Sequence, residues 1–185
     1  MYDVIIVGGG LAGLVNAIML STAGFKVLLI EKKSYPFDKV CGEYVSNEVV
    51  TFLQSINAYP IDEGAAHISR LQLSSVSGSS ATLQLPLGGF GISRLKFDQY
   101  LYEKAKASGA EFLLDTIVET IDFDGNNFSI DCREGKRLNA EIVIGAYGKR
   151  SGIDKTLKRA FFFKRSPYLG IKYHIKTDFP RDLVS

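Results

Sequence analysis

The sequence predicts an α/β fold that begins with a parallel strand–helix–strand unit and continues into antiparallel strands. A short β-branched run at Tyr2–Val7 passes through consecutive glycines into a helical apolar pattern, and a second apolar run follows at Phe25–Ile30. Both runs are almost wholly apolar, as strands are when a parallel sheet is covered on both faces. Residues 70–75 and 81–87 alternate with period two around a Ser/Gly turn, which is typical of an antiparallel hairpin.

Length and composition indicate one globular domain and exclude several function classes. The chain has 185 residues, of which 46% are hydrophobic and 23% charged. Its net charge of +2 is spread without a block of like charge, so we expect no nucleic-acid partner. The two cysteines and two histidines lie far apart, so we expect no metal site and no disulfide framework. The absence of a targeting signal predicts a cytoplasmic protein.

The first uncharged segment, Val4–Phe25, has the length of a membrane span. Three glycines divide it, however, and no Lys or Arg precedes it, so we expect a strand, a turn and a helix and no integral membrane segment. An apolar substrate would still allow loose association with a membrane surface.

The turn after the first strand contains a Gly-x-Gly-x-x-Gly array formed by Gly8, Gly10 and Gly13. The first glycine allows the tight turn, the second lets a pyrophosphate approach the backbone, and the third lets the helix pack close to the strand. The N–H groups at the helix start, including those of Leu11 and Ala12, are then free to bind phosphate at the positive end of the helix dipole. This array predicts a dinucleotide-binding unit.

The second strand ends at an acid. Glu31 follows Phe25–Ile30, and its carboxylate can accept hydrogen bonds from an adenosine ribose. Lys32 and Lys33 come next, and two interpretations stay open for them: contact with a 2′-phosphate, which would favour NADP, or simple solvation.

Residues 34–56 open as a Pro-containing loop and gain helical spacing through Val45, Val49 and Ile56. Cys41 and Gly42 lie where the loop meets this helix. They either bind an anionic ring edge or activate the thiol through the helix-start N–H groups, or they are small residues beside a cap.

A further helix is expected over Arg94–Ser108, with Ser93 as its N-cap and Gly109 as its stop. Arg94 falls in the first turn, where a cation is unfavourable, so it either points outward or binds an anion.

The later strands are predicted to form a meander. Turns at Asp124–Asn126 and Arg133–Lys136 separate them, and an apolar strand returns at Ile142–Gly145. Alternation over Tyr168–Ile175 predicts one more strand.

Four segments together resemble the FAD-dependent oxidoreductases of the p-hydroxybenzoate hydroxylase-like superfamily, and within it the geranylgeranyl reductase family and related monooxygenases. The resemblance begins with YDVIIVGGGLAGLVNAIMLSTAGFKVLLIEK at 2–32 and continues through Val40–Ser46, Ser93–Phe112 and Glu141–Ile153. It implies a Rossmann-like FAD-binding domain interrupted by antiparallel strands of a substrate domain.

The resemblance also implies site residues. The cofactor-binding set is Gly8, Gly10, Leu11, Ala12, Gly13, Glu31, Lys32, Cys41, Gly42, Arg94, Val118 and Ala146. In this family Arg94 would contact the phosphate or ribityl region of FAD, and the backbone at Val118 would meet the adenine. Cys41 would lie near the flavin and the substrate cavity, which makes it the one possible catalytic side chain.

Two departures from the family pattern matter. The family usually writes Gly-Ala-Asp-Gly where this chain has Gly145–Gly148 with Tyr147 in third place, which puts direct use of NADH or NADPH in doubt. A later Gly-Asp motif of the family is missing, so we expect a truncated chain, the N-terminal half of a protein about twice as long.

These observations predict a discontinuous FAD-binding domain at 1–65 and 90–155, with an incomplete antiparallel substrate-binding domain at 66–89 and 156–185. The predicted function is an FAD-dependent oxidoreductase, either a geranylgeranyl reductase-like reductase or a monooxygenase. Its substrate would be an apolar or aromatic small molecule, with NADH or NADPH as electron donor, and the fragment alone is expected to be inactive. The alternatives are a flavin-free NAD(P)-dependent dehydrogenase and a non-catalytic dinucleotide-binding remnant. The sequence does not determine the oligomeric state.

Overall fold

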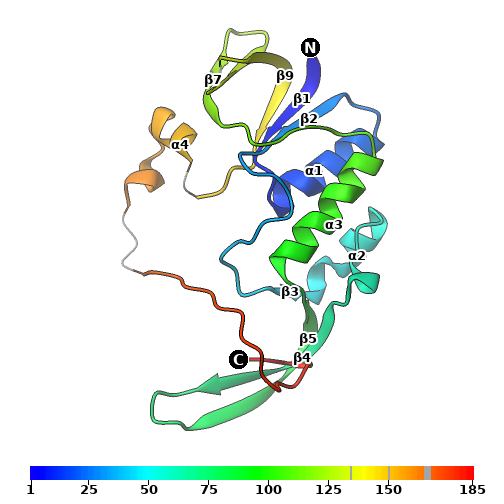
Figure 1. Cartoon of the computed structure of the whole chain (residues 1–185), viewed down its shortest axis with the longest axis vertical. Coiled ribbons are helices and arrows are strands. Elements are labelled where there is room, and N and C mark those ends of the chain that lie inside the picture. The colour runs from blue at the N-terminus through cyan, green and yellow to red at the C-terminus, as the bar shows by residue number, and fades with distance from the viewer. Residues whose placement is uncertain (134, 150, 165–167) are drawn as a thin grey trace. The chain divides into compact units, whose positions relative to one another are not determined.

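The computed structural model describes residues 1–133, 135–149, 151–164 and 168–185 (Figure 1). The chain divides into two compact units, which are described separately. The first comprises Met1–Phe37 and Asp98–Leu169, and the second comprises Asp38–Phe97 and Gly170–Ser185.

A six-stranded sheet with the strand order β6-β2-β1-β9-β8-β7 forms the centre of the first unit. Its strands are β1 (Tyr2–Val7), β2 (Val27–Ile30), β6 (Glu111–Leu113), β7 (Val118–Phe123), β8 (Phe128–Cys132) and β9 (Arg137–Gly145). Strand β1 is parallel to both β2 and β9, and β2 is parallel to β6. Strands β7, β8 and β9 form an antiparallel meander. The predicted parallel core and meander are therefore confirmed, although the second turn includes residue 134, which lies outside the described residues.

Helix α1 (Leu11–Thr22) covers the first two strands with one face. Its buried residues Gly13, Leu14, Ala17 and Ile18 recur at helical spacing. The uncharged N-terminal segment is thus a strand, a turn and a helix, as predicted. No helix in the described part of the chain has both the length and the apolar character needed to cross a membrane.

The hydrophobic core of this unit joins the parallel and antiparallel parts of the sheet. Ile5 and Ile30 come from the parallel strands and Ile130 from the meander, and each is at most 1% exposed. Complete burial of such a side chain contributes roughly 1.5–3 kcal/mol, so this shared core holds the ends of β1, β2 and β9 in place.

The second unit contains a four-stranded sheet with the order β10-β4-β5-β3. Its strands are β3 (Tyr44–Ser46), β4 (Ala66–Ser74), β5 (Ser80–Gly91) and β10 (Leu183–Val184), with η1 (Asn47–Val49), α2 (Val50–Ser55) and η2 (Ile61–Glu63) between β3 and β4. Strands β4 and β5 form the predicted hairpin, longer than the alternating pattern indicated, and it lies outside the parallel sheet.

Helix α3 (Arg94–Ala107) begins as predicted, because the Ser93 hydroxyl accepts the N–H of Lys96 at 3.3 Å. Its residues 94–97 count with the second unit and 98–107 with the first. The chain then contains the short helices α4 (Gly152–Thr156) and η3 (Ala160–Phe163).

Two predicted elements are wrong. The helix expected to start near Val45 starts later, because Val45 belongs to β3 and pairs with Phe90, and Ser46 then caps η1. The strand expected over Tyr168–Ile175 is absent: residues 168–175 pair with no strand among the described residues. Apart from the half-buried Lys172, their side chains are exposed on both alternating faces. Alternation alone, without a sheet edge to pair with, does not make a strand.

The compact units differ from the predicted domain boundaries. Residues 38–65 count with the second unit and residues 156–169 count with the first unit. The assignment of cofactor and substrate roles to these segments stays a prediction.

Candidate cofactor-binding site

Three parallel strands of the first unit end at the same edge of the sheet. Val7, at the end of β1, lies in register with Ile30 of β2 and with Gly145 of β9. The residues that follow, Gly8, Glu31 and Ala146, therefore leave the sheet together. In open parallel sheets this carboxyl edge is where ligands bind.

Two glycines of the turn occupy positions that no other residue fits. Gly8 has a φ of +108°, and a Cβ there would lie 2.5 Å from the carbonyl oxygen of Ala146. A Cβ on Gly13 would overlap the carbonyl oxygen of Gly8. The backbone at the strand end and the start of α1 are thus in direct contact, which confirms the reason predicted for both glycines.

The first turn of α1 presents unpaired N–H donors. Gly10 is the N-cap and supplies no side-chain cap, and no acidic residue stands in the first turn. The N–H groups of Leu11, Ala12 and Gly13 have no acceptor one turn earlier within the helix, because its first backbone bond runs from Leu14 N–H to Gly10 O at 2.9 Å. Donors at the positive end of a helix dipole are suited to a phosphate group.

Glu31 is fixed beside this turn. The residue is 7% exposed, and its Oε2 accepts the Gly9 N–H at 2.7 Å. Its backbone N–H donates to Leu113 O at 3.0 Å, and its carbonyl accepts the Thr116 N–H at 3.1 Å. The carboxylate is therefore held at the end of β2, where the sequence predicts a ribose contact.

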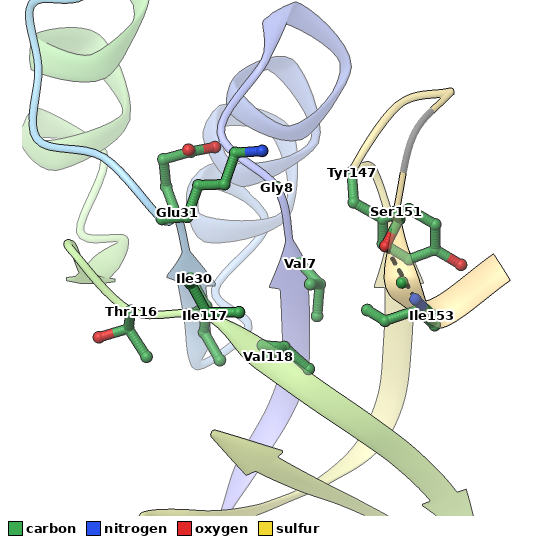
Figure 2. Close-up of a pocket in the computed structure, with 12 residues that line it drawn as sticks. Val7, Gly8, Ile30, Glu31, Thr116, Ile117, Val118, Tyr147, Ser151 and Ile153 are labelled. Atoms are coloured by element: carbon green, nitrogen blue, oxygen red, sulfur yellow. Dashed lines mark hydrogen bonds between the residues drawn. The ribbon is translucent and has the colours of Figure 1, made fainter. Parts of the chain in front are cut away.

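A pocket of about 140 Å³ opens at this edge (Figure 2). Its lining comprises Val7, Gly8, Ile30, Glu31, Lys32, Thr116, Ile117, Val118, Tyr147, Ser151, Gly152 and Ile153. Figure 2 shows Val7 and Gly8 at the end of β1, Glu31 at the end of β2, and Tyr147 with Ser151 on the other side. Four predicted site residues, Gly8, Glu31, Lys32 and Val118, thus share one pocket.

Tyr147 stands where the family usually has Asp. Burial raises the pKa of its phenol above the ordinary value, and the nearby charge of Asp154 adds to the rise. Asp154 is 1% exposed and lies 3.3 Å from the guanidinium of Arg159. The pocket therefore has a neutral phenol on this side, close to a buried carboxylate.

The other predicted site residues have these positions. Ala146 donates its N–H to Val7 O at 2.8 Å, directly after the end of β9. Cys41, Gly42 and Arg94 belong to the second unit. There the Cys41 sulfur accepts the Glu43 N–H at 3.4 Å, and the Arg94 N–H donates to the Glu43 carboxylate at 2.8 Å. Their cofactor roles, and a catalytic role for Cys41, stay predictions.

Among the residues that the structure describes, one group of potential metal ligands occurs, and it lies in the second unit. Ligand atoms of Asp38, Glu43 and His174 lie within 4.8 Å of one another. The ammonium of Lys172 donates to Asp38 at 3.1 Å and to Glu43 at 2.7 Å. Because a lysine already pairs with both carboxylates, the group is an ion-pair network that ties residues 38–43 to the segment around Lys172.

Sequence reasoning missed one residue beside the glycine turn. The hydroxyl of Tyr35 donates to the Gly9 carbonyl at 2.6 Å. Tyr35 lies in a loop without apolar periodicity, so no pattern marks it. The only signal is the extra glycine of the Gly8-Gly9-Gly10 run, which the dinucleotide motif does not require.

This edge of the sheet has the parts of a dinucleotide site: a glycine turn without room for a Cβ, free helix-start donors and a fixed carboxylate. Residues 1–168 match the family described as FAD binding domain, and the chain belongs to this family. The resemblance stated from the sequence motifs is therefore confirmed, and so is the prediction of FAD as the cofactor class.

Several curated relatives of this chain are named as reductases. The chain is 33% identical over 163 residues to digeranylgeranylglycerophospholipid reductase 1 of Methanosphaera stadtmanae, covering 84% of this chain and 40% of that protein. It is 24% identical to menaquinone reductase of Mycobacterium tuberculosis, covering 97% of this chain and 46% of that one. The chain thus spans less than half the length of these relatives.

Solved structures confirm the fold. The p-nitrophenol 4-monooxygenase PnpA of Pseudomonas putida superposes with a TM-score of 0.76 at 19% identity, covering 85% of this chain and 43% of that chain. The halogenase PltM, in complex with phloroglucinol and FAD, superposes with a TM-score of 0.72 at 19% identity, covering 85% of this chain and 36% of that chain.

Proposed function

We propose that the protein is an FAD-dependent oxidoreductase that reduces or hydroxylates an apolar or aromatic small molecule. The observation that carries the proposal is the common edge of β1, β2 and β9, where Gly8, Glu31 and the free N–H groups of α1 lie together. When bound, FAD supplies hydride or oxygen chemistry, so the chain itself needs no nucleophile.

Each residue at this edge has a binding task. The N–H groups of Leu11 and Ala12 bind the pyrophosphate, which the helix dipole favours without a basic side chain. The Glu31 carboxylate accepts hydrogen bonds from the adenosine ribose, and its bond to the Gly9 N–H keeps it in position. The proposal assigns the adenine to the backbone at Val118, which lines the pocket of Figure 2.

The remaining assignments concern the flavin end of FAD. Arg94 contacts the phosphate or ribityl region, and Cys41 with Gly42 lies near the flavin ring and the substrate. These assignments rest on the match of their segments to the family.

The class of substrate is inferred from relatives. Digeranylgeranylglycerophospholipid reductase and menaquinone reductase, to which the chain is similar, are named for isoprenoid molecules. This supports the reductase branch and an apolar substrate, which permits loose association with a membrane surface. NADH or NADPH is the proposed donor class, although Tyr147 replaces the family Asp linked with nicotinamide contacts.

The proposal is tested by Gly10→Val. Gly10 has a φ of −82° and a ψ of −174°, which any residue adopts, so valine there mainly fills the space of the pyrophosphate. We expect the Kd for FAD, measured by titrating the apoprotein, to rise at least about 100-fold, a loss of roughly 2.7 kcal/mol. Ala23→Val, at the other end of α1, is the control and should leave the Kd unchanged. Equal FAD affinity in both variants would contradict the assignment.

A further inference from the structure

We propose that Tyr35 is a positioning residue of the cofactor site, whose hydroxyl orients the Gly9–Gly10 peptide so that the Gly10 N–H faces the pyrophosphate of FAD. This inference rests on the proposed function and assigns a role to a residue outside the dinucleotide motif. It also explains Gly9, which the motif leaves open.

The ring of Tyr35 is held by other aromatic rings of the first unit. It stacks on Tyr102 with centroids 4.4 Å apart and planes 16° apart, and it lies 5.2 Å from the ring of Phe37. Tyr102 in turn meets Phe112 edge-on at 4.7 Å. Such ring pairs stabilise a packed aromatic side chain beyond its burial, so the hydroxyl has a fixed direction.

That hydroxyl and Glu31 fix the backbone on both sides of Gly9. Tyr35 donates to the Gly9 carbonyl at 2.6 Å, and the Gly9 N–H donates to Glu31 at 2.7 Å. A trans peptide is planar, with its carbonyl and N–H on opposite sides. Turning the Gly9 carbonyl toward Tyr35 therefore turns the Gly10 N–H the other way and removes a carbonyl oxygen from the path of an anionic ligand.

The side chain of residue 9 is excluded by the same contact. A Cβ on Gly9 would overlap the Tyr35 hydroxyl and would lie 3.0 Å from the Cβ of Glu31. Because the Tyr35 hydroxyl occupies the space that a side chain at residue 9 would need, this position requires glycine. Tyr35 and Gly9 therefore act together to orient the turn.

The phenol remains a donor across the accessible pH range. Burial raises the pKa of Tyr35 well above its ordinary value of 10.0, and the neighbouring charges of Glu31 and Asp98 raise it further. A positioning effect of Tyr35 on FAD affinity should therefore be the same at pH 7 and pH 9.

The test compares Tyr35→Phe with the wild-type protein, expressed from its full reading frame, in the Kd of the apoprotein for FAD, ADP and adenosine. Phenylalanine keeps the ring stack and removes only the hydroxyl. We expect the Kd for FAD and for ADP to rise about 3-fold to 10-fold at both pH values, and that for adenosine to change less than about 2-fold. Tyr2→Phe, which removes a hydroxyl bonded to Glu111 at 2.7 Å on the same sheet, is the matched control and should change none of the three.

The outcomes separate the two proposals. A wild-type protein that does not bind FAD contradicts the proposed function itself. Wild-type binding with an unchanged Kd in Tyr35→Phe, or an equal loss for adenosine, overturns the role of Tyr35, because a purely structural tyrosine would not act through the pyrophosphate alone. A second variant, Gly9→Ala, should weaken FAD binding less in the Tyr35→Phe background than in the wild type, and additive losses would also overturn the role.

Discussion

Replacing Gly8 with alanine tests the tight contact between the glycine turn and the end of β9. Two costs add at this position. The φ of +108° is unfavourable for an L-residue by about 1–2 kcal/mol. The new Cβ would lie 2.5 Å from Ala146 O and 2.6 Å from the Cα of Tyr147, and because both atoms belong to the backbone, the overlap adds about 1–3 kcal/mol. We therefore expect Gly8→Ala to lower the free energy of unfolding by about 2–5 kcal/mol.

Gly24→Ala provides the matched control. Gly24 also has a positive φ, +88°, but a Cβ there would meet nothing within 4 Å, so only the backbone cost applies. Urea denaturation measures the free energy of unfolding of both variants. We expect Gly8→Ala to be less stable than Gly24→Ala by about 1–3 kcal/mol, which corresponds to about 2–12 °C in Tm. Equal losses in the two variants would refute the reasoning, because they would show that the turn does not press against the end of β9.

Two further predictions concern phenols of the first unit. Burial raises the pKa of Tyr147, so the folded protein favours the neutral phenol, and this contribution to stability is complete below pH 10 and is lost as the pH rises further. The difference in the free energy of unfolding between wild type and Tyr147→Phe should therefore fall above pH 10, and a difference that does not change with pH would contradict this. Tyr2 has its pKa raised to about 12, chiefly by its hydrogen bond to Glu111, so its stabilisation is complete below pH 10 and is lost as the pH rises toward 12. The stability difference between wild type and Tyr2→Phe should therefore shrink over that range, and a pH-independent difference would show that the bond does not favour the protonated phenol.

The strand–helix–strand unit could be predicted from the sequence because each local signal agrees with the tertiary environment. Tyr2–Val7 is a β-branched apolar run, and Glu31 follows directly after a buried strand. Gly8 and Gly13 are needed because a Cβ at either position would overlap backbone atoms. The same agreement explains why Gly8, Glu31 and Val118 share a pocket as expected.

The two wrongly predicted elements lie where the local hydrophobic pattern of the sequence disagrees with the strand pairing of the folded chain. Val45 fits a helical spacing, but its backbone pairs with Phe90 of β5. The alternation over Tyr168–Ile175 has no described strand beside it. Tyr35 escaped prediction for a different reason: its function depends on a hydroxyl reaching a backbone carbonyl 26 residues earlier, and a contact of that kind leaves no periodicity.

The central claim, that this chain holds FAD at the edge of β1, β2 and β9, is tested most directly by the visible spectrum of the protein purified from its full reading frame. The spectrum is recorded before and after anaerobic addition of NADH or NADPH. The account predicts flavin absorption that is released as FAD on denaturation, and bleaching would then identify the donor. A colourless protein that takes up no added FAD would contradict the account.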